Sequence, residues 1–268
     1  MDDPDLKLLL VIVLVLIAAG AGWYFRDELL PTQDEAVVAL PEETSDAAAV
    51  EGVPKYPVAP YALPQDGSVE LMPLPPLDDS DGYFLLALVD VFGSTVEPLL
   101  MKDVIIDRFV ATVDNLPRDH VSEKIRPVGR LGDAFRVDTE GKNGPIYVSP
   151  ENYQRYDSLV SRIITADVDA IVDTYRRFYP LLQQSFERLG YPNAYFNDRV
   201  IEVIDHLLST PEVDEPIELI RPHVLYLFAD PELEALSSGQ KLLLRMGGEH
   251  AAVTKRMLRE LRTQLAKQ

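Results

Sequence analysis

The sequence of 268 residues contains no cysteine and a single tryptophan. The absence of cysteine excludes a disulfide framework, thiol catalysis and lipid attachment after an apolar leader. The Gly-x-Ser-x-Gly turn of serine hydrolases is also missing. Residues 141–144, GKNG, lack the Gly-Lys-Ser/Thr ending of a phosphate loop. Together these absences remove the commonest enzyme classes, so we lean against an enzyme and expect no cofactor.

Basic residues are scarce: 25 Lys and Arg stand against 44 Asp and Glu, which gives a net charge of −19. No basic stripe occurs, and basic and aromatic residues do not alternate as they do in known nucleic-acid-binding modules. The sequence therefore predicts no nucleic-acid partner.

One long apolar run, Leu6 to Phe25, opens the chain. About 20 such residues cross the ~30 Å hydrocarbon core of a bilayer. Trp23 and Tyr24 end the run, where aromatic rings favour the headgroup level. We therefore predict a transmembrane anchor over residues 1–26. A cleaved signal peptide stays open as the alternative, because Ala19–Ala21 fits a small-x-small cleavage site.

The flanks of this run give little orientation signal, since Lys7 and Arg26 oppose each other. We expect a single-pass protein of a bacterial inner membrane with its soluble domain in the periplasm. The absence of cysteine suits an exported domain.

Residues 27–82 differ from the rest in composition. They hold nine prolines, thirteen acidic residues and one basic residue, Lys55, for a net charge of −12. Proline and repelling like charges predict a disordered acidic tether. The stretch VPKYPVAPYALP is of polyproline type and suits either a semi-rigid spacer or a ligand for an aromatic groove.

Residues 83–268 are predicted to form a mainly helical globular domain. Helices are expected over residues 84–92, 102–115 and 167–189, with a kink or break at Pro180. A further helix is expected over residues 199–208, capped by Asn193 or Asn197. Residues 126–148 contain four glycines and two short alternating runs, which indicate a β-hairpin or an irregular insertion.

Six segments carry a family resemblance: LPPLDDSDGYF, FVATVDNLP, SPENYQRYDSLV, YRRFYPLLQQSFERLGYP, FNDRVIEVIDHLLSTPEV and FADPELEALSSGQKLLLRMG. Over roughly Leu74 to Arg262 the chain resembles bacterial domain-of-unknown-function family number 3014. The resemblance implies an uncharacterised membrane-anchored protein of the Gram-negative envelope with a mainly helical domain. It implies no activity, ligand or catalytic residue.

Three carboxylates, Asp198, Glu202 and Asp205, follow the i, i+4, i+7 spacing of one helix face. Such a row is usually a solvated face, but in a cleft beside Tyr153, Tyr175 and Arg176 it would suit acid–base hydrolysis of a glycan. Glu202 and His206 share metal-ligand spacing, although a surface ion pair explains them more simply and we expect no metal site.

Aromatic residues crowd into residues 153–196, mixed with arginines. Tyrosine and arginine are enriched at binding hot spots, while the same rings also build ordinary cores. We select as the exposed candidates for partner binding Tyr156, Arg176, Arg177 and Tyr179.

The C-terminal residues 239–268 carry a net charge of +5. Cations near a helix C-terminus complement its dipole. The alternative hypothesis is that this helix contacts anionic lipid headgroups or the acidic tether through Lys255, Arg256, Arg259 and Arg262.

Three functions follow from these observations. The first is a membrane-tethered binding or scaffold protein that engages an envelope protein or a cell-wall component. The second is a hydrolase of an envelope polymer that uses Asp198, Glu202 and Asp205. The third is an assembly or regulatory factor whose tether and basic helix change position. The helical composition and the lack of a catalytic constellation favour the first.

Overall fold

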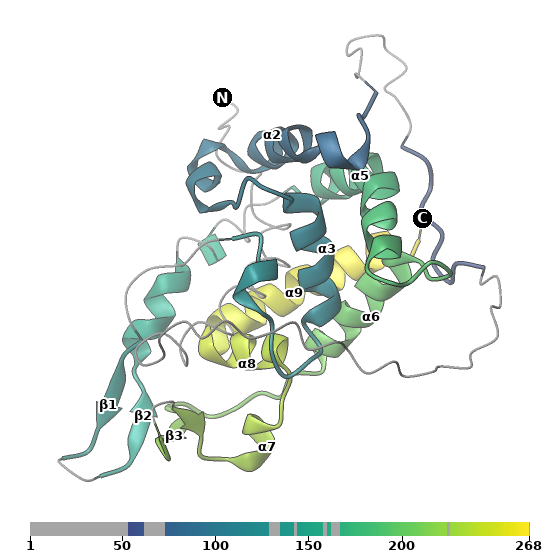
Figure 1. Cartoon of the computed structure of the whole chain (residues 1–268). Helices are drawn as coiled ribbons and strands as arrows, with labels where there is room; N and C mark the ends of the chain where they lie inside the picture. The colour runs from purple at the N-terminus through teal and green to yellow at the C-terminus, as the bar shows by residue number, and fades with distance from the viewer. Residues whose placement is uncertain are drawn as a thin grey trace, which may run out of the picture.

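The computed structural model describes residues 53–61, 73–128, 135–141, 144–157, 160–161, 167–223 and 226–267, and these are mainly helical (Figure 1). The prediction of a mainly α fold is confirmed. The helices are α2 (Asp81–Phe92), α3 (Ile105–Asn115), α5 (Val168–Arg188), α6 (Phe196–Leu208), α7 (Pro231–Glu234), α8 (Ser238–Arg245) and α9 (Gly248–Leu265). Short 3₁₀ helices occur at Leu77–Asp79, Ser94–Leu99, Glu123–Ile125 and Pro150–Tyr156.

The main hydrophobic core lies between α2, α3, α5, α6, α8 and α9. Helix α3 packs against α2, α5 and α6, while α9 packs against α5, α6 and α8. Phenylalanine rings meet at the centre: Phe84 lies edge-on to Phe178 at 5.1 Å between centroids, and Phe196 contacts Phe186 at 5.5 Å. Offset and edge-on rings add to the burial energy of the core.

Helix α6 shows why these segments form helices. Its apolar residues recur three or four positions apart and are all buried: Phe196, Val200, Val203, Ile204 and Leu207. This spacing places them on one face of a helix, as the sequence predicted. The opposite face is left for polar side chains.

The structure bears on two local predictions. Of the kink or break at Pro180, the break is wrong, because α5 continues from Val168 to Arg188; the kink stays a prediction. Pro180 lies on the exposed side of α5, and its missing N–H leaves the carbonyl of Arg176 without the usual helix donor. Neither Asn193 nor Asn197 caps α6; the N–H of Phe196 instead donates to the side chain of Gln183 in α5 at 2.8 Å.

A four-stranded antiparallel sheet forms a small second layer in the order β1-β2-β3-β4. Its strands are β1 (Val137–Thr139), β2 (Ile146–Val148), β3 (Glu218–Ile220) and β4 (Leu227–Phe228). The predicted hairpin is therefore confirmed as β1 and β2, where Asp138 pairs with Tyr147. The sheet packs on α7 and the edge of α8 through a separate apolar cluster that includes Val148, Leu219, Phe228, Leu233 and Leu244.

The predicted anchor over residues 1–26 lies outside the described residues. Within the described ranges, no helix has both the length and the apolar character that crossing a bilayer requires. Of the predicted tether, residues 53–61 and 73–82 are described. Leu77 is buried in the main core and α2 begins at Asp81, while residues 53–61 lie against α6 (Figure 1).

A pair of glycine substitutions tests the packing of α8. A Cβ on Gly239 would lie 2.6 Å from Leu207 Cδ2 and 3.2 Å from the Leu116 carbonyl oxygen, whereas Gly82 has open space. We expect Gly239→Ala to lower the free energy of unfolding by about 1–3 kcal/mol through overpacking. Gly82→Ala should raise it by up to about 1 kcal/mol, because alanine favours a helix. Urea denaturation followed by circular dichroism measures both, and equal effects would contradict this packing.

Candidate functional site

An open groove of about 690 Å³ runs along the polar face of α6. We call it the α6 groove. Its walls come from α6 itself, from the end of α3 and from the turn between α5 and α6, and they include Asp114, Tyr191, Tyr195, Asp198, Glu202 and Asp205. The three carboxylates that the sequence singled out therefore line one groove.

Each carboxylate of the row has its own partner. Asp198 accepts hydrogen bonds from backbone N–H groups, Glu202 forms an ion pair with Arg199 at 3.0 Å, and Asp205 forms one with Arg262. Of the residues expected beside these carboxylates, Tyr175 is close to α6, because its hydroxyl donates to Asn197 in the first turn of that helix. Tyr153 lies elsewhere and lines a different cavity. All three carboxylates of the row therefore already accept hydrogen bonds from groups of the protein itself.

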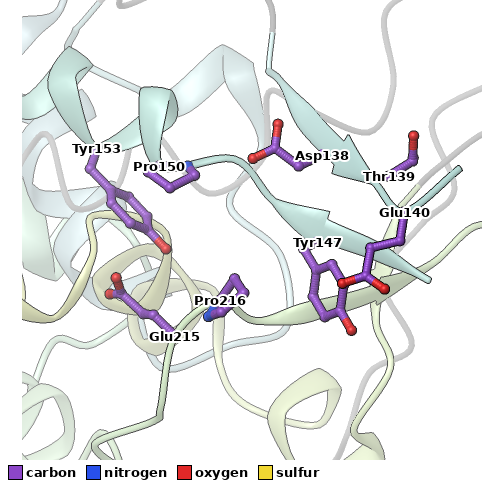
Figure 2. A pocket seen from close by; sticks show the side chains of 8 residues that line it. All are labelled: Asp138, Thr139, Glu140, Tyr147, Pro150, Tyr153, Glu215 and Pro216. Carbon is purple, nitrogen blue, oxygen red and sulfur yellow. The ribbon is translucent and has the colours of Figure 1, made fainter. Parts of the chain in front are cut away.

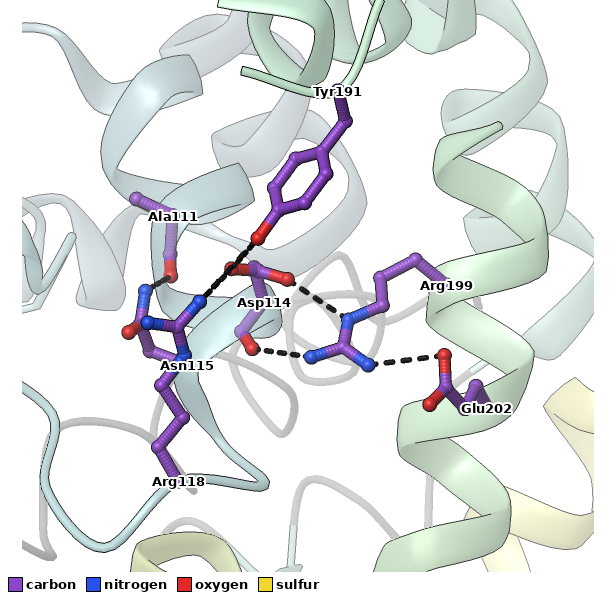
Figure 3. Close-up of polar contacts among 7 residues, drawn as sticks. All are labelled: Ala111, Asp114, Asn115, Arg118, Tyr191, Arg199 and Glu202. Carbon is purple, nitrogen blue, oxygen red and sulfur yellow. Dashed lines mark hydrogen bonds and ion pairs between the residues drawn. The ribbon is translucent and has the colours of Figure 1, made fainter. Parts of the chain in front are cut away.

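One of the residues that line the groove is a buried carboxylate, Asp114, whose contacts Figure 3 shows. Asp114, at the end of α3, is 3% exposed. Its Oδ1 accepts from Arg199 Nε at 2.9 Å, and its Oδ2 accepts from Arg118 at 3.0 Å and from the Tyr191 hydroxyl at 3.3 Å. Because a buried charge is costly without partners, this network explains how Asp114 remains inside the protein.

Arg199 connects the buried network to the groove surface. Its guanidinium also donates to the Asp114 carbonyl at 2.8 Å and reaches Glu202 on the next turn of α6 (Figure 3). Burial opposes its charge, but the hydrogen bonds and charges of Glu202 and Asp114 win and raise the pKa of Arg199 above its ordinary value. Arg199 thus stays charged and fixes the first turns of α6 against α3.

The groove already holds a piece of the chain. At a bend in residues 53–61, the N–H of Lys55 donates to Asp198 Oδ2 at 2.9 Å and the N–H of Tyr56 to Oδ1 at 2.8 Å. The side chain of Asn197, which is fully buried, donates to the Tyr56 carbonyl at 2.8 Å. Tyr175 orients Asn197 by donating to its Oδ1 at 3.1 Å. Hence one dipeptide makes three main-chain hydrogen bonds with α6.

The side chain of Tyr56 reaches the C-terminal helix. It packs against the main core, and its hydroxyl lies beside Arg262 of α9. Asp205, and to a lesser degree Tyr56, raises the pKa of Arg262 above its ordinary value. The docked segment therefore contacts α6 through its backbone and α9 through one ring.

The binding candidates selected from the sequence lie on other surfaces. Tyr156 is buried, while Arg176, Arg177 and Tyr179 are half-buried on α5. Arg176 pairs with Asp173 at 3.1 Å, and Arg177 lies over the ring of Phe178. Burial raises the pKa of Tyr179 to about 12. These residues do not line the α6 groove.

The two candidate metal ligands, Glu202 and His206, each contact a different residue. His206 shares a hydrogen bond with Ser237 at 2.8 Å, and Glu202 pairs with Arg199 instead. The ion pair expected between Glu202 and His206 is replaced by these contacts. In the part of the chain that the structure describes, no group of three or more His, Asp or Glu side chains is placed to hold a metal ion.

The four basic residues proposed for membrane or tether contact differ in burial and in partners. Lys255 is buried, and its ammonium donates to the Thr210 carbonyl at 2.5 Å. Burial lowers the pKa of Lys255. Arg262 pairs with Asp205 and lies near Tyr56, while Arg256 and Arg259 are exposed on α9.

A second cavity, of about 630 Å³, lies between the hairpin and the loop at Pro216 (Figure 2). The hydroxyl of Tyr153 is buried and points toward Glu215, whose carboxylate accepts from the N–H of Gly248 at 2.6 Å. Burial, followed by the charge of Glu215, raises the pKa of Tyr153 to about 12. Tyr147, Asp138 and Glu140 complete an aromatic and acidic wall.

Comparison with known proteins identifies a family for the chain. The model of a family described as a protein of unknown function, DUF3014, matches residues 105–262, more than half of the chain. The chain belongs to the DUF3014 family. The matched range begins at α3 and includes the groove residues Asp114, Asn197, Asp198 and Arg199, whereas the docked residues 53–61 precede it. No curated protein and no solved structure matches the chain.

Sequence reasoning missed Asn197 and Asp114. Asn197 was considered as a cap, but its role depends on Tyr56, 141 residues earlier in the chain. Asp114 follows a run of apolar residues in α3, where an acidic side chain that must be buried needs a cation. An acidic residue at a buried position of the helical pattern is therefore the feature of the sequence that indicates a buried ion pair at Asp114.

Removal of the buried carboxylate tests the network. We expect Asp114→Ala to lower the free energy of unfolding by about 3–5 kcal/mol, because Arg199 loses its buried partner. Arg118→Ala, which removes an exposed partner of the same carboxylate, should cost less than about 1 kcal/mol. Chemical denaturation of both variants gives the comparison. Similar costs would contradict the greater weight assigned to the buried carboxylate.

His206 predicts a pH effect. Burial, aided by the charge of Arg199, lowers the pKa of His206. The folded protein therefore binds this proton more weakly than the unfolded chain, whose histidine pKa is about 6.5. Stability should fall as pH decreases from about 6.5 toward the lower folded pKa. His206→Gln should flatten this slope, measured by denaturation between about pH 8 and 5. An unchanged slope would assign the pH dependence to other groups.

Proposed function

We propose that this chain is a membrane-tethered, non-enzymatic binding protein of the bacterial envelope whose helical domain engages a protein partner through the α6 groove. One observation carries this proposal: Asp198 and Asn197 make three hydrogen bonds with the main chain of Lys55 and Tyr56. Main-chain recognition of this kind is how many domains take up peptide segments of other proteins.

The walls of the groove support the same function. Tyr191 and Tyr195 stand beside Arg199, and these residue types are enriched at the centre of protein interfaces. Tyr191 is held by its stacking on Phe186, at 4.6 Å between centroids, so its orientation is fixed before a partner arrives. Pre-organised side chains lose less entropy on binding.

The membrane location rests on the sequence. The apolar run of residues 6–25 suits an inner-membrane anchor, and the acidic proline-rich stretch between it and Leu77, the first of the described residues that is buried in the main core, suits a spacer to a periplasmic domain. A cell-wall component as the partner remains part of the proposal, because the groove also presents carboxylates and tyrosines to a glycan.

A hydrolase is the second candidate, since Asp198, Glu202 and Asp205 line one groove. Glycan hydrolysis needs one carboxyl group that gives a proton to the leaving oxygen. In the groove, however, all three carboxylates accept from N–H groups or guanidinium groups. This pattern serves non-covalent binding better than proton donation.

Photo-crosslinking in cells tests the binding function. We would place a photoreactive phenylalanine analogue at Tyr195, in the groove, or at Tyr83 on α2 as the control, in the full-length chain purified from membranes. We expect a discrete crosslinked protein from position 195 and none of that mass from position 83, and the crosslink should weaken in an Asp198→Asn background. Crosslinks that are identical at both positions, or absent from position 195, would contradict a groove partner. Turnover of peptidoglycan by the wild type and not by Glu202→Gln would instead establish the hydrolase.

A further inference from the structure

The docked bend has the chemistry of a ligand. Lys55 and Tyr56 turn two successive N–H groups toward one carboxylate, a backbone arrangement that binds anions. Pro54 and Pro57 flank them, and proline fixes its own φ and restricts the residue before it. The bend therefore loses little conformational freedom when it binds.

The residues of α6 that bind the segment are more buried and have more hydrogen-bond partners than the segment itself. Asn197 is fully buried, held by Tyr175 and within hydrogen-bonding distance of the Leu265 carbonyl, and Asp198 lies on the rigid first turn of α6. The Lys55 contact is at the exposed edge, and Tyr56 contributes one partly buried ring. A pre-formed site that holds a short, separate segment suits an exchangeable contact.

Open space remains in the groove beside the segment. Val53, Lys55 and Tyr56 form one side of the 690 Å³ space, and Tyr191, Tyr195 and Glu202 lie around the remainder. A longer peptide bound in place of the segment would extend over these side chains and add contacts that the chain's own segment does not make.

We propose that Asn197 and Asp198 form a peptide-binding site for a Pro-x-aromatic-Pro segment, and that residues 54–57 occupy it in cis as a competing ligand. This inference rests on the proposed binding function and gives its ligand class. Two main-chain N–H groups bind the Asp198 carboxylate, one carbonyl binds Asn197, and the aromatic ring lies beside Arg262. A partner segment of this pattern displaces residues 54–57 from the groove.

Competition gives the first test, with a fluorescent peptide of residues 51–61 as the probe and full-length protein in detergent micelles. Tyr56→Pro removes the second N–H donor and vacates the site. Because a tethered competitor acts at an effective concentration of about 1 mM, Tyr56→Pro should bind the peptide at least about tenfold more tightly than the wild type. Tyr56→Phe keeps the N–H and the ring and loses only the hydroxyl beside Arg262, so its peptide affinity should lie between those of the wild type and Tyr56→Pro.

The receptor variants complete this test. In the Tyr56→Pro background, Asp198→Ala should abolish peptide binding, whereas Glu249→Gln, which changes an exposed carboxylate of α9 outside the groove, should preserve it. Equal binding by the wild type and Tyr56→Pro, or binding that survives Asp198→Ala, would overturn the inference.

Limited trypsin digestion reports the cis contact without a peptide. Lys55 is the one basic residue between Asp27 and Gly82, so cleavage after it yields a unique fragment beginning at Tyr56. Docking holds this bond on α6, and cleavage follows the undocked population. Asp198→Asn should accelerate the cut by at least about fivefold, while Glu249→Gln, outside the groove, leaves it unchanged. Equal rates in all three proteins would overturn the cis contact.

The outcomes separate this inference from the binding function. Peptide binding to Tyr56→Pro without a crosslinked partner at Tyr195 supports the peptide site and removes the proposed partner. A crosslinked partner whose capture is unaffected by Asp198→Ala supports a groove partner and overturns the peptide site.

Discussion

The ion pair between Asp114 and Arg199 is the interaction on which the groove depends. Asp114 ends α3 and Arg199 lies in the first turn of α6, so the pair fixes one helix against the other. Arg199 also binds the Asp114 carbonyl, which makes the alignment specific to one geometry. Asn197 and Asp198 lie in the same turn of α6. The buried ion pair therefore helps to set their position opposite the docked segment.

Helix α6 serves the fold and the site with opposite faces. Val200, Ile204 and Leu207 are buried in the main core, while Asp198, Glu202 and Asp205 project into the groove. Burial of the apolar face stabilises the helix in its place in the core. The residues of the polar face are therefore not needed for that packing and can serve binding. The three carboxylates take three different partners, the peptide backbone, Arg199 and Arg262, although they share one spacing.

Much of the fold could be predicted from local patterns, and the site only in part. The spacing of Phe196 to Leu207 predicts α6, and the alternating runs around Val137 and Tyr147 predict the hairpin. Strands β3 and β4 were missed because they are only two or three residues long and lie among prolines. The carboxylate row was found from its spacing, but its partners lie on α9 and in residues 53–61, and such distant contacts leave no periodic signal.

The contacts of the docked segment do not follow from the opposite net charges of the tether and the C-terminal residues. The tether carries −12 and the C-terminal residues +5, which suggests attraction between opposite charges. Yet Lys255 is buried and Arg262 is paired with Asp205, so of the four candidates Arg256 and Arg259 remain exposed. The contact itself uses two N–H groups, a carbonyl and the Tyr56 ring, none of which carries a formal charge. Because short hydrogen bonds at a half-buried carboxylate are screened far less than separated surface charges, docking depends on the bend between Pro54 and Pro57 rather than on the net charge of the tether.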